Sequence, residues 1–160
     1  MNTYNPKEFG FNHLIKYFKK HPYPNFEYNI YVDKYKVKFL VEPYIKTSQT
    51  YAYMTTKEEI EQGNYDSLPN SFVIKSTKGS GLSYHRMVTS PFDMNVFIPT
   101  MKQWLLPHPH MATQKQYDLV TPGVLIEEHL GNNLIDYKFH MFHGKLEMIQ
   151  LHINNISRII

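Results

Sequence analysis

The feature that most constrains this chain is an apolar run that ends in a lysine and leads into a glycine-bearing turn. Residues 72–81 read FVIKSTKGSG. The apolar run predicts a β-strand over SFVIKS, 71–76. The turn that follows is short enough for a hairpin connection, so LSYHRMV, 82–88, is expected to return as an antiparallel strand. The sequence therefore predicts a β-hairpin over about 71–90.

Two interpretations of the turn are open at this point. It has neither the spacing of a P-loop nor that of a dinucleotide-binding fold. It could be an ordinary hairpin turn with solvated lysines. Glycines also let backbone N–H groups approach a ligand, and a lysine adds a point charge for phosphate oxygens. The residues of such a cradle would be Lys75 on the strand and Lys78, Gly79, Ser80 and Gly81 in the turn.

Composition limits the class of protein. The chain has 160 residues, of which 42% are hydrophobic and 15% aromatic. These values predict a globular protein of one domain, or of two small subdomains that share a core. The net charge of +3 is mildly basic. It lacks the clustered basic excess of nucleic-acid-binding proteins, so no nucleic-acid partner is expected.

The chain has no cysteine, which excludes disulfides, thiolate nucleophiles and cysteine-based zinc sites. The first twenty residues hold no uninterrupted apolar segment of the kind found in a secretory signal. No stretch approaches the ~20 apolar residues of a membrane span. We therefore expect a cytoplasmic protein without a transmembrane segment.

The N-terminal part is expected to be mainly helical. Residues 7–20 have apolar positions at helical spacing. Residues 28–45 fit either a strand or a helix, and we favour a helix with Asp33 in its first turn. One exposed helical turn is expected over 57–62. The loop GNYDSLPNS, 63–71, is the best candidate boundary, because it is dense in turn residues.

The boundary divides an N-terminal helical or mixed region, 1–66, from the remainder, 67–160. In the second region a helix is expected over 92–105, with Trp104 as a core anchor. VLIEEHL, 124–130, reads as a strand that runs into acidic residues. Two further strands are expected around a tight turn at Gly144. The order of elements predicts an α+β protein.

Two pairs of charged residues could take part in catalysis or binding. Glu127 and Glu128 end the VLI strand, either as ordinary exposed glutamates or as a hinge that reads a nucleotide base and ribose. Asp136 and Lys138 share one face of a strand that we expect to be an inner one. They could pair with each other at a sheet edge, or they could contact a ligand.

Histidines are numerous, but their arrangement argues against a metal site. There are nine, including His108 and His110 around a proline, and His140 and His143 near a turn. His140 and His143 would lie on opposite sides of a strand. Without cysteine or an HExxH motif, we expect no transition-metal centre. No serine lies in a nucleophile-elbow context, so a catalytic triad is not expected either.

Four segments in order resemble the ATP-grasp superfamily, and specifically its teichuronopeptide-biosynthesis (TupA-like) branch. The resemblance covers about residues 11–155. The segments are DKYKVKFLV at 33–41, LPNSFVIKSTKGSG at 68–81, VLIEEHL at 124–130 and DYKFHMFHGKLEMIQ at 136–150.

The resemblance implies a fold of antiparallel sheets with a glycine-rich hairpin lid at about 71–90 and a hinge at about 124–130. It implies an ATP-dependent carboxylate–amine ligase, in which an acylphosphate forms and an amine captures it as an amide, normally with Mg²⁺. Its partners would be ATP, a small carboxylate, and an amine or glycan acceptor. The pathway implied by the branch is the biosynthesis of a cell-surface polysaccharide or peptidyl polymer.

The resemblance also implies roles for individual residues. Lys75 would face the nucleotide phosphates, and Lys78 to Gly81 would form the lid. Lys138 would lie near the transferring phosphate as the catalytic basic residue. The hinge would comprise Glu127, Glu128 and Leu130, with Glu128 toward the ribose. Asp33 and Lys34 match an early pair of the branch, for which we assign no role.

One departure concerns the metal. Where the family continues to carboxylate and asparagine ligands for Mg²⁺, this chain reads LHINNISRII, with His152, Asn154 and Asn155 at the positions expected to be acidic. Neutral amides are poorer Mg²⁺ ligands than carboxylates. We therefore expect a C-terminally shortened fold with an incomplete metal site, whose ligands are unknown and which a partner chain or oligomer could complete.

Three functional hypotheses follow. The first is the ATP-grasp ligase. The alternative is a nucleotide-binding but catalytically inactive ATP-grasp remnant with a regulatory or assembly role. The third is a structural module whose glycine turn is only a turn.

Overall fold

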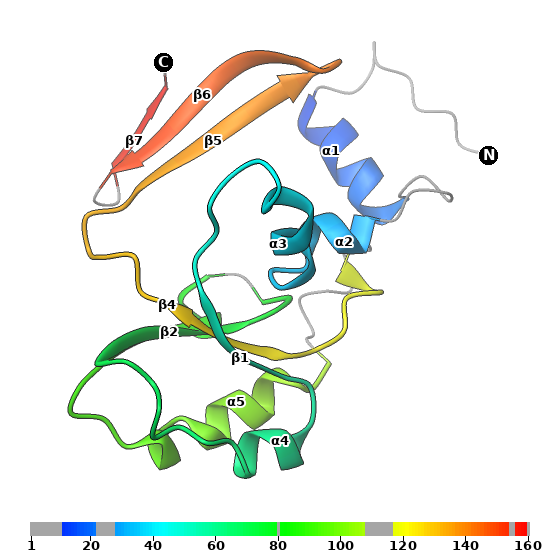
Figure 1. Cartoon of the computed structure of the whole chain (residues 1–160). Helices are drawn as coiled ribbons and strands as arrows, with labels where there is room; N and C mark the ends of the chain where they lie inside the picture. The colour runs from blue at the N-terminus through cyan, green and yellow to red at the C-terminus, as the bar shows by residue number, and fades with distance from the viewer. Residues whose placement is uncertain (1–10, 22–27, 80, 108–116, 154–155, 160) are drawn as a thin grey trace. The chain divides into compact units, whose positions relative to one another are not determined.

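The chain forms two compact units, which are described separately below. The structure is a computed structural model that describes residues 11–21, 28–79, 81–107, 117–153 and 156–159. The first unit comprises residues 1–129 and the second comprises residues 130–160 (Figure 1). The boundary expected between residues 66 and 67 therefore falls inside the first unit. The assignment of 67–160 as a nucleotide-binding region stays a prediction.

The first unit is built on an antiparallel sheet of four strands in the order β1-β4-β2-β3. Its strands are β1 (Thr50–Met54), β2 (Ser71–Ser76), β3 (His85–Thr89) and β4 (Val124–Glu128). The predicted pairing of β2 with β3 is confirmed, but β3 begins at His85, because residues 82–84 form a 3₁₀ turn, η1 (Leu82–Tyr84). β1 precedes the expected boundary in sequence, yet it pairs with β4 from the far end of the unit. This pairing joins residues from the two sides of the expected boundary in one sheet.

The register of β2 and β4 sorts their side chains onto two faces. Ile74 lies opposite Ile126, and Val73 lies opposite Glu127. Successive residues of a strand point to opposite faces of the sheet. The two strands therefore present apolar side chains on one face, and both apolar and charged side chains on the other. The apolar face holds Phe72, Ile74, Val124 and Ile126, and the charged face holds Val73, Lys75, Leu125 and Glu127.

Helices α4 (Lys57–Glu61) and α5 (Ile98–Trp104) pack on the apolar face, on one side of the sheet in Figure 1. Trp104 is buried in this core, as predicted. The helix expected over 92–105 is present but shorter, because a 3₁₀ turn, η2 (Met94–Val96), precedes it. Pro99 lies in the first turn of α5, where its missing N–H is not needed. The helical turn expected over 57–62 is confirmed, although its Ile60 is fully buried.

On the other side of the sheet, the helix expected over 28–45 is present as two short helices (Figure 1). These are α2 (Tyr28–Val32) and α3 (Lys36–Val41). Asp33 was expected in a first helical turn but lies between them. Its Oδ1 accepts hydrogen bonds from the N–H groups of Tyr35 at 2.9 Å and Lys36 at 3.1 Å, which starts α3. The predicted N-terminal helix is α1 (Phe11–Lys20). None of the described helices is long and apolar enough to cross a membrane.

The second unit is an antiparallel sheet of three strands in the order β5-β6-β7. They are β5 (Ile135–Phe142), β6 (Lys145–Ile153) and β7 (Ile156–Ile159). The predicted tight turn is confirmed, with φ angles of 49° at His143 and 76° at Gly144. The expectation that β5 is an inner strand was wrong. It lies at the edge of this sheet, and its Asp136 and Lys138 are exposed.

We predict that Ile74→Ala lowers the free energy of unfolding by about 2–5 kcal/mol. Ile74 is fully buried between the sheet and its helices, so truncation leaves a cavity. Met87→Ala on β3 is the matched control, because Met87 is 62% exposed and should cost under about 1 kcal/mol. Urea denaturation measures both. Equal losses for the two variants would contradict the assignment of faces.

Candidate functional site

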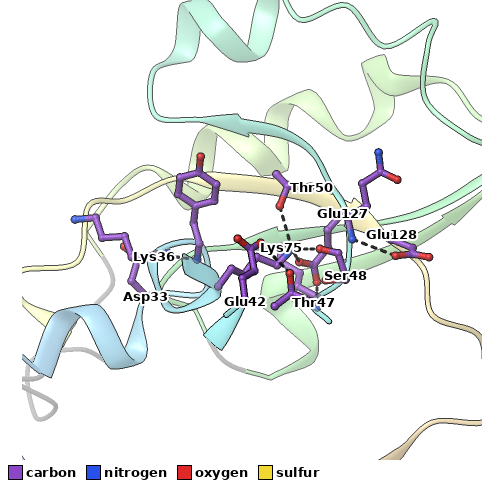
Figure 2. A network of polar contacts seen from close by, with 12 residues as sticks. Asp33, Lys36, Glu42, Thr47, Ser48, Thr50, Lys75, Glu127 and Glu128 are labelled. Atoms are coloured by element: carbon purple, nitrogen blue, oxygen red, sulfur yellow. Dashed lines mark hydrogen bonds and ion pairs between the residues drawn. The ribbon is translucent and has the colours of Figure 1, made fainter. Parts of the chain in front are cut away.

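The centre of the charged face is the Glu127 carboxylate of β4, which two lysines hold from opposite elements. Its Oε2 lies 3.0 Å from Lys38 Nζ on α3, and its Oε1 pairs with Lys75 Nζ on β2. The side chain of Glu127 is only 6% exposed. Figure 2 shows Glu127 and Lys75 within the network of polar contacts. A carboxylate this buried needs such partners, since removing an unpaired charge from water is costly.

Lys38 connects this pair to the segment before β1. Its Nζ donates to the Ser48 carbonyl at 2.6 Å and to Thr50 Oγ1 at 3.0 Å, in addition to its ion pair with Glu127. An ammonium group has three N–H donors, so Lys38 has a partner for each. Lys38 was not among the residues predicted to form the site. Its position four residues after Lys34, in a predicted helix, was the signal that could have identified it.

The two lysines keep Glu127 ionised. Burial alone would raise the pKa of Glu127, but the hydrogen bond and charge of Lys75, followed by those of Lys38, outweigh burial and lower it. At neutral pH the carboxylate is therefore an anion between two cations.

Lys34, for which the resemblance implied no role, contacts the glycine turn. Its Nζ donates to the carbonyls of Ser76, at 3.0 Å, and Gly79, and lies 3.5 Å from the Thr77 carbonyl oxygen. Its backbone N–H also donates to the Thr77 carbonyl, at 3.2 Å. Burial lowers the pKa of Lys34 to about 8, and the neighbouring charge of Lys75 adds to this effect. Lys34 and Lys75 thus belong to one electrostatic cluster.

The first half of the turn is buried. Ser76 and Thr77 are inaccessible to solvent, and Lys78 is nearly so. The Thr77 N–H donates to the Gly123 carbonyl at 2.9 Å, and the Gly79 N–H donates to Ser76 Oγ at 3.2 Å. The predicted turn is present, but its action as a lid stays a prediction.

Two glycines of the turn are required for different reasons. A Cβ on Gly79 would lie 2.3 Å from the ring of Tyr84, so a side chain there has no room. Gly81 has a φ of 82°, a backbone conformation that favours glycine. Ser80, which the sequence placed in the cradle, lies outside the described residues.

In the expected hinge, Glu128 forms hydrogen bonds with the backbone of Gln49. The Glu128 N–H donates to the Gln49 carbonyl at 2.8 Å, and Glu128 Oε2 accepts from the Gln49 N–H at 3.1 Å. The side chain of Glu127 instead pairs with Lys38 and Lys75. The role of this segment in reading a base and a ribose stays a prediction.

Two predicted residues belong to the second unit. Leu130 begins that unit, and Lys138 lies on β5; both are exposed. The structure therefore brings Lys75, the turn and Glu127 together within the first unit. The assignment of Lys138 as catalytic stays a prediction.

A cavity of about 450 Å³ lies beside Lys38. Its walls combine aromatic, charged and hydroxyl side chains of α3 and the segment before β1: Tyr35, Lys38, Phe39, Glu42 and residues 47–50.

The described residues do not supply a metal site. Among them, no group of three or more His, Cys, Asp or Glu side chains is arranged to hold an ion. His108, His110, Asn154 and Asn155 lie outside the described residues. The ligands of Mg²⁺ therefore stay unassigned.

We predict that Glu127→Gln lowers the free energy of unfolding by about 3–5 kcal/mol, because it leaves two lysines without their buried counter-charge. The pKa of Glu127 is lowered from the ordinary glutamate value of 4.5, so this stability is present above pH 4.5 and is lost as pH falls through the pKa of the folded state. Urea denaturation between pH 3 and 7 measures the difference between wild type and variant.

Glu128→Gln is the control for this prediction. Glu128 accepts one hydrogen bond from backbone and is less buried than Glu127, so its substitution should cost under about 1 kcal/mol. If the Glu127 variant were no less stable than the Glu128 variant at pH 7, the buried ion pairs would not contribute as described.

Comparison with protein families gives a match. Residues 14–159, almost the whole chain, match the sequence model of the TupA-like ATP-grasp family. No curated protein and no solved structure matches the chain. Proteins of the ATP-grasp family generally bind ATP with Mg²⁺, and the family suggests a ligase-like, ATP-dependent function. On this match, the chain belongs to the TupA-like ATP-grasp family.

Proposed function

We propose that this protein is an ATP-dependent carboxylate–amine ligase. The observation that best supports the proposal is the position of Lys75. Its ammonium lies on the charged face of the sheet, at the end of the strand that leads into the glycine turn. Family membership gives the reaction class, and the lysine cluster gives a place for the phosphates.

Charge at the site suits a polyanion. Three ammonium groups, from Lys34, Lys38 and Lys75, lie near two carboxylates, from Asp33 and Glu127. Positive charge is therefore in excess at neutral pH. Clusters of lysine ammonium groups and backbone N–H groups stabilise the charge of phosphoryl groups.

Lys75 is the member of the cluster best placed to reach a ligand. Its side chain is 34% exposed, whereas that of Lys38 is 10% exposed. Lys38 also has three partners, which leaves it no free donor. We infer that Lys38 holds Glu127 in place while Lys75 exchanges its contact with Glu127 for a phosphate oxygen.

In the proposed reaction, a carboxylate oxygen of the substrate attacks the γ-phosphorus of ATP, and the bond to the β,γ-bridging oxygen breaks to release ADP. The amine then attacks the acylphosphate carbonyl, and inorganic phosphate leaves as the amide forms. The protein positions the groups and neutralises charge. When bound, Mg²⁺ would neutralise phosphate charge further.

The remaining assignments are part of the proposal. The Lys78–Gly81 turn would cover the phosphates, the Glu127–Leu130 segment would read adenine and ribose, and Lys138 would approach the transferring phosphate. The acceptor would be a small amine or a glycan in the biosynthesis of a cell-surface polymer, made from the cytoplasmic ATP pool.

We predict that wild-type protein binds ATP and that Lys75→Met weakens binding roughly 10- to 100-fold, as expected when a charge-assisted contact worth about 1.5–3 kcal/mol is lost. Lys57→Met is the matched control, because Lys57 is an exposed lysine on α4, whose helix packs on the opposite face of the sheet. Isothermal titration calorimetry measures the three affinities.

Absence of ATP binding by wild type would contradict the proposal. Turnover is tested separately, as ADP release with panels of carboxylates and amines in Mg²⁺. Tight binding with persistent absence of ADP release would instead favour a nucleotide-binding protein without catalysis.

We also predict that ATP binding at pH 8 takes up to about half a proton per site. Because the pKa of Lys34 is about 8, this side chain is neutral in about half of the molecules at that pH. A nearby triphosphate would raise the pKa and so protonate them. Calorimetry in buffers of different ionisation enthalpy counts the protons. Proton uptake should disappear in Lys34→Met. Equal uptake by wild type and this variant would contradict the assignment of the proton to Lys34.

A further inference from the structure

We propose that Lys34 is a positioning residue for the glycine turn: by gathering the carbonyl groups of Ser76, Thr77 and Gly79, it orients the peptide groups of the turn. The inference deepens the proposed function, on which its consequence for ATP rests. Its structural part can be tested without nucleotide.

The carbonyl groups of the turn converge on one ammonium group. Lys34 Nζ lies within 3.5 Å of the Ser76 and Thr77 carbonyl oxygens and also donates to that of Gly79. An ammonium group is a donor only, with three N–H groups, so it can satisfy several carbonyls at once. A neutral side chain such as that of glutamine has only two N–H donors and no positive charge.

Peptide geometry turns this convergence into an orientation of the N–H groups. In a trans peptide, the C=O of one residue and the N–H of the next point in opposite directions. The Ser76 carbonyl faces Lys34, and the Thr77 N–H correspondingly points away, to the Gly123 carbonyl at 2.9 Å. By the same geometry, the Thr77 carbonyl at Lys34 directs the Lys78 N–H away from the lysine. Such an N–H is a group that a phosphate oxygen can accept from.

Lys34 is itself held from both sides of its Cα. Asp33 Oδ1 caps the start of α3, and the Lys34 N–H donates to the Thr77 carbonyl at 3.2 Å. The side chain therefore extends from a fixed backbone onto the turn. This arrangement is what a positioning role requires, because the lysine cannot move without releasing the turn.

The opposite end of the same connection is anchored in the core. Trp104 Nε1 donates to the Ser83 carbonyl at 3.1 Å, and the ring of Tyr84 occupies the space beside Gly79. Trp104 is the single tryptophan of the chain, so its fluorescence reports on the connection between β2 and β3. Lys34 therefore contacts the connection between β2 and β3 at residues 76–79, and Trp104 contacts it at residue 83.

The test compares Lys34→Met and Lys34→Arg with Lys36→Met, a control lysine whose side chain has no hydrogen bond or ion pair among the described contacts. Amide hydrogen exchange is followed by NMR at pH 7 without nucleotide. We expect Lys34→Met to lower the protection of the Thr77 and Gly79 amides at least tenfold and to change Trp104 emission. Lys34→Arg, which keeps the charge and several donors, should restore most of the protection, and Lys36→Met should change nothing.

The amide of Ile126 in β4 reports whether a variant remains folded. If Lys34→Met lowers its protection equally, Lys34→Gln takes its place, because the amide of glutamine still donates but has no charge. Unchanged protection of Thr77 and Gly79 in a folded, uncharged variant would overturn the proposal.

ATP titration then separates this inference from the proposed function. We expect the uncharged Lys34 variant to bind ATP at least tenfold more weakly than wild type. Weakened ATP binding with unchanged amide protection would show that Lys34 acts on the ligand directly, which would also overturn positioning. If wild type fails to bind ATP, the proposed function fails, while the exchange result in the nucleotide-free protein still decides the role of Lys34.

Discussion

The buried Glu127 carboxylate is the constraint on which the charged face depends. A carboxylate at this depth is stable only when it is paired, and its two partners come from different elements, Lys38 on α3 and Lys75 on β2. The ion pairs therefore hold three segments that are far apart in sequence. They also hold the side chain of Lys75 next to the glycine turn. In the proposed function, a phosphate oxygen replaces Glu127 as the partner of Lys75.

The two faces of the sheet in the first unit differ in composition. Its apolar face packs against α4 and α5, where burial of apolar area supplies the stability. Its other face holds the charges, which are contacted by α3 and by the residues between α2 and α3. Among these residues, Lys34 contacts the turn after β2 through the carbonyls of Ser76, Thr77 and Gly79. A rigid support of this kind is typical of sites that must present charges at fixed positions.

Local patterns predicted much of the fold, and long-range pairing accounts for what they missed. The apolar run of β2, the glycine turn and the hairpin at Gly144 are all visible in short windows of sequence. The contact of Glu127 with Lys38 is not, because it depends on the register of β4 beside β2 and on the placement of α3 over both. Likewise, the DYKF pattern of β5 fits both an inner strand and an edge strand. The position of β5 at the sheet edge could therefore not be predicted from this pattern. The family could be identified by resemblance, but the contact of Lys34 with the turn could not, because it depends on how the chain folds.

The most direct test of the central claim is a crystal structure of the protein with a non-hydrolysable ATP analogue and Mg²⁺. The account predicts a phosphate oxygen within about 3 Å of Lys75 Nζ, with Lys38 still paired to Glu127 and the triphosphate beside the 76–79 turn. A nucleotide bound elsewhere, with the Lys75–Glu127 pair intact, would contradict it.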